Sequence, residues 1–376
     1  MSTERHYFPG NNTPQGFFSY YKYILGQREA NRIICIKGGP GTGKSTFMKR
    51  IGEKFAKLGE DIDYLHCSAD ENSLDGVILK NRRIALIDGT SPHITDPVTP
   101  GAVDKIINLG EFWNEEGIAA NKEEIIDLNE ESSRWYRIAY NYLNAAKSVY
   151  RSLEDIYYRA VENSEIYRIV ADIVNEEYST HPICLRPGRQ KKFFASAITP
   201  GGIVNYLRSL LNNIEKVYLI SVPEGFSNHS FMEIIKEGAV YRGYDTEIFY
   251  CPMGPEEKIE HLVIPQLKIA FITVNEYHDL EPWELFDEEE DVNYEREKEL
   301  TLIDVSDYMR QHIIEENALL MAELKEEYEI LLGRTIKALE WARNAHQRVE
   351  NMYIPNMNFT RISAFSEELF EELSKI

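Results

Sequence analysis

The strongest constraint on the fold of this chain is an internal repeat, because its two halves carry the same landmarks in the same order. Residues 37–48 read KGGPGTGKSTFM, and residues 221–232, at an offset of 184, read SVPEGFSNHSFM. Other pairs at this offset are Ile36 with Ile220, Gly59 with Gly243, Asp61 with Asp245 and Cys67 with Cys251. The sequence therefore indicates a tandem duplication in which each half forms the same kind of domain.

The repeat continues to the end of each half, and this continuity places the domain boundary. RIALIDG at 83–89 matches KIAFITV at 268–274, and an acidic insertion around 286–299 moves the later offset to 196. The junction lies near the basic segment PGRQKK, and a chain of 376 residues is long enough for two domains. We predict a first domain at 1–186, with a helical segment at about 111–180, and a second at 187–376, with a helical segment at about 300–376.

Strand and helix patterns alternate at the start of each half. In the first half, Arg32 to Lys37 is a short apolar strand, Lys44 to Leu58 is an amphipathic helix that Gly59 ends, and further strands lie at 62–67 and 84–88. Strands separated by helices form parallel sheets with crossover connections. The predicted fold class is therefore α/β, with a mainly parallel sheet in each half.

Long amphipathic helices are predicted after each sheet. One apolar stripe contains Trp135, Ile138, Tyr142, Ala145, Val149, Ile156 and Ala160; the matching stripe in the second half contains Leu320, Leu324, Tyr328, Leu331, Thr335, Leu339, Ala342, Val349 and Met352. Spacings of three and four are typical of helices that pack along one face. We expect these stripes to pack within the chain, helix against helix; the alternative is a surface for a protein partner or a second copy.

A glycine-rich loop in the first half carries the clearest chemistry. Gly38, Gly43, Lys44 and Ser45 have the spacing of the Walker A motif, between a predicted strand and a predicted helix. Glycines let successive backbone N–H groups point at phosphate oxygens, and the helix adds the positive end of its dipole. The predicted nucleotide-binding residues are Gly38, Gly39, Pro40, Gly41, Thr42, Gly43, Lys44, Ser45 and Thr46.

An acid at the end of a buried strand completes the predicted site. Ile84-Ala-Leu-Ile-Asp88 follows the glycine-rich loop by about forty residues, which is typical of an acid that holds Mg²⁺ through water. We expect Lys44 to neutralise the outer phosphates of ATP, and Ser45 and Asp88 to hold Mg²⁺. Gly89, and not a second acid, follows Asp88, so hydrolysis should be slow or should use a group from elsewhere in the chain.

With these motifs the chain resembles the P-loop NTPase superfamily, whose signature is GGPGTGKST. The doubled arrangement and the segment DGTSPHITDP are similar to a poorly characterised family of bacterial P-loop ATPases with two such halves. The resemblance covers nearly the whole chain. It implies two tandem three-layer domains and ATP as the ligand, but no particular substrate beyond the nucleotide.

The second half has lost the residues that would hold triphosphate and magnesium. The repeat register places Val222 at Gly38, Ser227 at Gly43, Asn228 at Lys44, His229 at Ser45 and Thr273 at Asp88. The lost lysine and glycines supply most of the electrostatics of a phosphate site. We therefore predict one nucleotide site, in the first half.

Further candidates for the chemistry each have a structural alternative. Asp70 follows the strand at 62–67, where open sheets bind ligands, so it either orients an attacking water or is a solvated loop acid. Arg186 and Arg189 either reach the transferred phosphate as arginine fingers or belong to a solvated linker. His93, Asp96 and Pro97 have counterparts in the second half, as Cys67 does, so we expect them to shape the fold; the alternative for His93 is to sense or polarise a nearby phosphate.

Composition limits the partners and the function classes. The net charge of −21 disfavours nucleic acid and anionic membranes. The N-terminus lacks a signal peptide, no run of eighteen apolar residues occurs, and the four cysteines are scattered, so we expect a cytoplasmic protein with reduced, mostly buried thiols. The leading hypothesis is a slow ATPase; the alternatives are a P-loop kinase for a nucleotide or small molecule, and an ATP-stabilised scaffold with negligible turnover.

Overall fold

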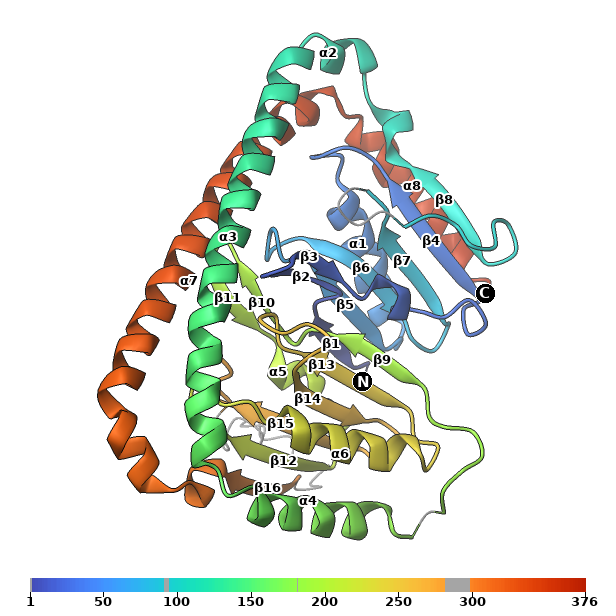
Figure 1. Ribbon diagram of the computed structural model, residues 1–376. Helices are drawn as coiled ribbons and strands as arrows, with labels where there is room; N and C mark the ends of the chain where they lie inside the picture. The colour runs from blue at the N-terminus through green and yellow to red at the C-terminus, as the bar shows by residue number, and fades with distance from the viewer. Residues whose placement is uncertain (1, 91–94, 181, 281–297) are drawn as a thin grey trace, which may run out of the picture. The chain divides into compact units, whose positions relative to one another are not determined.

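The computed structural model describes residues 2–90, 95–180, 182–280 and 298–376 (Figure 1). These residues form two compact units. Unit 1 contains Met1–Asn141, Ala197–Val204 and Arg334–Ile376, and unit 2 contains Tyr142–Ser196 and Asn205–Gly333. The units thus differ from the division at residue 186 that follows the sequence repeat. Each unit combines the sheet of one repeat with much of the helical segment that follows the other.

Unit 1 contains a six-stranded mixed sheet in the order β1-β5-β6-β7-β4-β8. The strands are β1 (Glu4–Tyr7), β5 (Ile62–His66), β6 (Leu74–Leu79), β7 (Ile84–Asp88), β4 (Arg32–Lys37) and β8 (Asp104–Asn108). β6 is antiparallel to both of its neighbours, and the other adjacent pairs are parallel. The α/β class with mostly parallel strands is confirmed, and the antiparallel β6 was not predicted.

Unit 2 contains a second six-stranded sheet with the equivalent order, β9-β13-β14-β15-β12-β16. Its strands are β9 (Gln190–Phe193), β13 (Thr246–Tyr250), β14 (Ile259–Ile264), β15 (Ile269–Val274), β12 (Lys216–Ser221) and β16 (Glu299–Asp304). Here β14 is the antiparallel strand, as β6 is in unit 1. The repeat in the sequence is therefore a repeat in the structure, and the predicted junction near 187–192 runs into strand β9.

A short hairpin follows the first strand of each repeat. The hairpins are β2–β3 (Gly10–Thr13 and Gly16–Ser19) and β10–β11 (Ser196–Thr199 and Gly202–Asn205). The Thr-Pro-x-Gly turns of the two hairpins require left-handed backbone at the glycine, with φ of 102° at Gly16 and 116° at Gly202.

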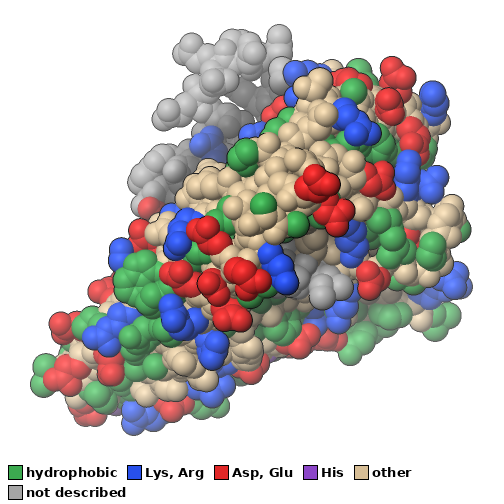
Figure 2. All heavy atoms as spheres, turned by 90° about the horizontal axis from the view of Figure 1, so that it is seen from above, with side chains coloured by type: hydrophobic (Ala, Val, Ile, Leu, Met, Phe, Trp, Pro, Cys, Tyr) green, Lys and Arg blue, Asp and Glu red, His purple; other side chains and the backbone are tan. Residues whose placement is uncertain are grey.

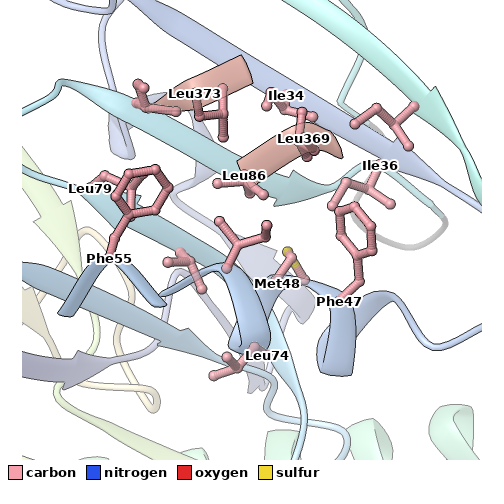
Figure 3. Packing of buried hydrophobic residues seen from close by; sticks show 14 of the residues in the cluster. Ile34, Ile36, Phe47, Met48, Phe55, Leu74, Leu79, Leu86, Leu369 and Leu373 are labelled. Atoms are coloured by element: carbon pink, nitrogen blue, oxygen red, sulfur yellow. The ribbon is translucent and has the colours of Figure 1, made fainter. Parts of the chain in front are cut away.

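Helices α1 (Lys44–Ala56) and α8 (Phe359–Leu373) pack on the same face of the unit 1 sheet (Figure 3). Phe47, Met48 and Phe55 of α1 and Leu369 and Leu373 of α8 share one apolar cluster with strand residues that include Ile34 and Leu86. Each fully buried side chain of this size contributes about 1.5–3 kcal/mol. The C-terminal helix of the chain is therefore part of the core beneath the first repeat's sheet.

The remaining helices are α2 (Glu115–Ala119), α3 (Lys122–Ala160), α4 (Asn163–Tyr178), α5 (Leu207–Leu210), α6 (His229–Val240) and α7 (Gln311–Tyr353), with short 3-10 turns at Tyr21–Tyr23, Leu109–Phe112, Val305–Tyr308 and Ile354–Asn356. Within unit 1, α3 packs on α7: the rings of Trp135 and Trp341 lie 4.3 Å apart, and Ile125, Leu128 and Val349 form a cluster. Helix-against-helix packing of the stripes is thus confirmed for unit 1.

The register of the α3 stripe was predicted wrongly by one position along much of its length. Ala139, Leu143, Ala146, Tyr150 and Leu153 are buried, whereas Ala145 is exposed and Trp135 and Ile138 are half-buried. Alanines on the contact line let neighbouring elements approach closely, and the prediction followed the larger side chains instead. In α7 the predicted Tyr328, Thr335, Leu339, Ala342 and Val349 are buried, but Leu320 is exposed.

Surface and thiol properties complete the description of the fold. On the face drawn in Figure 2, acidic side chains are interspersed with lysines and arginines. Among the described residues, no helix combines the length and apolar character needed to cross a membrane.

Cys35, Cys67 and Cys251 are buried free thiols and Cys184 is exposed, in agreement with the prediction of mostly buried, reduced cysteines.

Candidate functional site

The glycine-rich loop, residues 38–45, connects β4 to the first turn of α1. Gly41 and Gly43 have φ of 66° and 83°, a left-handed region that strains residues with a side chain. Gly43 is the N-cap of α1, so the N–H groups that the helix leaves unbonded lie at this loop. The loop therefore presents backbone donors and the positive end of a helix dipole, as an anion site requires.

Lys44 and Asp88 meet at this loop. Lys44 Nζ donates to the carbonyl oxygens of Gly38 and Gly39, both at 3.0 Å, and lies 3.6 Å from Asp88 Oδ2. Asp88 ends β7, the parallel neighbour of β4, and both side chains are mostly buried. The structure thus brings together the lysine and the acid that the sequence placed forty-four positions apart.

The hydroxyls of the loop are held by backbone groups. Ser45 Oγ accepts a hydrogen bond of 2.9 Å from the N–H of Leu74, the first residue of β6. Thr42 Oγ1 donates to the carbonyl of Gly39 at 2.9 Å, and Asp88 Oδ1 accepts from the N–H of Thr90 at 2.9 Å. Ser45 retains a lone pair beyond this bond, so a hydroxyl ligand for Mg²⁺ is compatible with its surroundings.

Asp70 lies in the turn after β5 and caps that turn. Its carboxylate accepts hydrogen bonds from the N–H of Asn72 and the hydroxyl of Ser73. These bonds show that Asp70 stabilises the turn. That Asp70 also orients an attacking water stays a prediction.

The C-terminal part of α7 forms a wall against the glycine-rich loop, which the sequence did not predict. A side chain added at Gly39 would lie 2.6 Å from the ring of Tyr353, and one at Gly41 would lie 3.1 Å from the carbonyl oxygen of Glu350. The absence of Cβ atoms therefore lets the loop pack directly against the helix.

Two further residues of α7, Arg343 and His346, lie on the side of the loop near Asp70. Arg343 Nη1 lies 3.3 Å from Glu71 Oε1, and Glu71 is the neighbour of Asp70. One helical turn further on, half-exposed His346 lies 3.9 Å from Glu350. Partial burial lowers the pKa of His346, and the charges of Glu350, Lys44 and Asp70 also act on it. Helix α7 thus places a cation and an imidazole beside the residues predicted for chemistry.

Asp75, on β6, is a further buried acid that the sequence analysis missed. It is 3% exposed and lies one residue before Gly76, which pairs with Ile87 of β7. Burial raises the pKa of Tyr21, and the charges of Asp75 and Asp88 both contribute to that rise. Asp75 was overlooked because an acid inside a strand interrupts the apolar run by which strands are recognised.

In the second half, the residues that replace the phosphate-binding groups bond to the protein. Asn228 Nδ2 donates to Thr273 Oγ1 at 2.7 Å, so the counterparts of Lys44 and Asp88 are joined to each other. His229 Nδ1 accepts from the N–H of Ile259. Lys258, from a different position in the repeat, donates to the carbonyl of Phe226 at 3.2 Å.

A cavity of about 260 Å³ beside this second loop is lined by charges of both signs. Lys147 pairs with Glu257 at 3.0 Å, and Lys258 lies 3.7 Å from Glu154. Because its cations are neutralised by protein carboxylates, the cavity lacks the free positive charge that a triphosphate needs.

Glu260, His261 and His278 form a buried cluster in unit 2, with one potential ligand atom of each within 4.8 Å of the others. The backbone N–H of Thr273 donates to His261 Nδ1, so the proton of the neutral imidazole is on Nε2. An imidazole that binds a metal through Nε2 instead carries its proton on Nδ1. Burial lowers the pKa of both histidines, which fits two neutral imidazoles. His278 Nε2 is hydrogen-bonded to Ser196, whereas His261 Nε2 has no hydrogen-bond partner among the described residues.

The other predicted residues lie away from this loop or outside the described residues. Arg189 forms a forked pair with Asp245, which accounts for its side chain within unit 2, and Arg186 is exposed. Asp96 is exposed and pairs with Lys37 at 3.3 Å. His93 and most of the acidic insertion, 286–297, lie outside the described residues.

No family model, curated protein or solved structure matches this chain.

Proposed function

We propose that this protein binds ATP with Mg²⁺ at the glycine-rich loop of unit 1 and hydrolyses it slowly. The observation that carries the proposal is the meeting of Lys44 Nζ, the loop carbonyls and Asp88 at the N-terminus of α1. A lysine held by loop carbonyls is available to phosphate oxygens, which form stronger, charge-assisted hydrogen bonds.

In the proposed reaction, the oxygen of a water molecule forms a bond to the γ-phosphorus of ATP. The bond to the β,γ-bridging oxygen breaks, ADP leaves with the electron pair, and the water's proton passes to phosphate or solvent. Lys44 and the loop N–H groups bind the negative charge. Ser45 and Asp88 would hold Mg²⁺, which supplies further charge neutralisation, and Asp70 would orient the water.

The second half would not bind ATP in this account, because the neutral side chains of Asn228 and Thr273 are hydrogen-bonded to each other where the intact half has Lys44 and Asp88. Its retained sheet order supports a structural part for this half.

The test is phosphate release from ATP by the purified protein, compared with Lys44→Ala and with its repeat mate Asn228→Ala. We expect Lys44→Ala to abolish turnover and Asn228→Ala to leave it within about twofold. Turnover that survives Lys44→Ala contradicts the proposal. Transfer of the γ-phosphate to an added metabolite would instead support the kinase alternative, and Lys44-dependent ATP binding without turnover would support the scaffold.

A further inference from the structure

We propose that Arg343 of α7 binds the γ-phosphate of ATP in the transition state, and that Glu71 holds its guanidinium until the nucleotide arrives. This inference rests on the proposed function. It places the missing catalytic group in the C-terminal part of the chain, and not at Arg186 or Arg189, the two arginines suggested by the sequence.

Arg343 shares one face of α7 with residues that lie near the glycine-rich loop. Residues 343, 346, 350 and 353 are spaced by three and four, so they share a face of α7. Two of them, Glu350 and Tyr353, contact the glycine-rich loop, and His346 lies within the electrostatic reach of Lys44 and Asp70. Arg343 lies about 10 Å of helix from Glu350, and its guanidinium contacts Glu71, the chain neighbour of Asp70.

The present ion pair of Arg343 is partly open to solvent. The side chains of Arg343 and Glu71 are 32% and 25% exposed, so water and salt weaken the attraction between them. A phosphate with two or more negative charges competes well against such a pair, because arginine binds it through two parallel hydrogen bonds. Glu71 therefore holds the guanidinium near the site without retaining it.

The internal repeat gives Arg343 a counterpart in unit 2. At the offset of 196, Arg343 corresponds to Lys147 on α3, which pairs with Glu257 in unit 2 at 3.0 Å. An ion pair that only clamps the helix to the loop requires a cation of either kind. Arg343 belongs to unit 1, which contains Lys44, whereas Lys147 belongs to unit 2, which does not. This is the distribution expected if the two parallel donors of the guanidinium bind a phosphate.

In the hydrolysis step, Arg343 would donate to the γ-phosphate oxygens while the bond to the attacking water forms and the bond to ADP breaks. It gains and loses no proton. The chemistry is therefore balanced without any further reactant, and the effect is on the rate.

The experiment measures kcat and the ATP affinity of full-length Arg343→Ala, Arg343→Lys and Glu71→Gln, with Lys147→Ala as the matched control. We expect Arg343→Ala to lower kcat at least about 100-fold with ATP affinity within about threefold, and Arg343→Lys to remain at least about tenfold impaired. Glu71→Gln should raise turnover above that of the wild type, because loss of the carboxylate charge frees the guanidinium for the phosphate, and Lys147→Ala should not change turnover.

If the Arg343–Glu71 ion pair only holds α7 against the loop, a different pattern is expected. Glu71→Gln then loses as much turnover as Arg343→Ala, and Arg343→Lys keeps wild-type turnover. That pattern, or unimpaired Arg343→Ala, overturns the inference. If Arg343→Ala does not fold, Arg343→Lys and Glu71→Gln decide alone. Wild-type protein without Lys44-dependent turnover would contradict the proposed function itself, whereas turnover that is insensitive to Arg343 contradicts this inference only.

Discussion

Truncation of one leucine in α8 tests whether the end of the chain stabilises the first repeat's sheet. Leu369 is 1% exposed and lies in the apolar cluster with α1 and the strands of unit 1. Leu→Ala substitutions at fully buried sites cost about 2–5 kcal/mol, since transfer energy and a residual cavity both contribute. We expect Leu369→Ala to lower the free energy of unfolding of unit 1 by about 3 kcal/mol.

The assay is urea unfolding followed by tryptophan fluorescence. Three of the four tryptophans, Trp113, Trp135 and Trp341, belong to unit 1, so the signal reports mainly on that unit. With a typical urea dependence, a loss of about 3 kcal/mol lowers the midpoint by about 1–3 M.

The matched control is Leu58→Ala, because Leu58 belongs to the same unit, is 63% exposed and should change stability by less than about 0.5 kcal/mol. An equally small effect of Leu369→Ala would refute the packing of α8 on this sheet.

Three further predictions concern the site and the pH dependence. Gly41→Ala should weaken ATP binding at least about tenfold, because it places a side chain at φ 66° and 3.1 Å from the carbonyl oxygen of Glu350. Gly225→Ala, the equivalent change in the second half, should leave ATP affinity unchanged. Calorimetric titration with ATP compares the two variants. Asp88→Asn should lower phosphate release at least about 100-fold and reduce its response to Mg²⁺, and unaltered magnesium dependence would argue against its assigned role. Burial, reinforced by the charge of His6, lowers the pKa of His66 from 6.5 to about 4, so the folded state favours the neutral imidazole. Stability from His66 is present above pH 6.5 and is lost as pH falls toward 4. At pH 4.5 the loss is about 2–3 kcal/mol, so urea midpoints of His66→Gln should depend less on pH than those of the wild type.

The elements predicted correctly are those with dense local signals. Strands β4 and β7 match the predicted 32–37 and 84–88 at both ends, because each is an uninterrupted apolar run next to a strong loop signal. The glycine-rich loop and the start of α1 at Lys44 follow from one motif. The meeting of Lys44 and Asp88 follows in turn, since parallel neighbours end at the same edge of a sheet.

The features missed by the sequence analysis depend on contacts that no local pattern encodes. Strand β6 contains Asp75 and Gly76, so neither alternation nor an apolar run identifies it, although every residue of it is buried. No pattern within residues 334–376 indicates that this segment packs on the sheet of the first repeat. Its position in the chain suggested the sheet of the second repeat instead. Arg343 could not be recognised for the same reason, because its neighbours Glu71 and Asp70 are brought to it only by folding.

The central claim is a single ATP site at the glycine-rich loop, and calorimetric titration of the full-length protein with a non-hydrolysable ATP analogue and Mg²⁺ tests it most directly. The account predicts one molecule bound per chain, no binding by Lys44→Ala, and unchanged binding by Asn228→Ala. Two molecules per chain, or binding that survives Lys44→Ala, would contradict it.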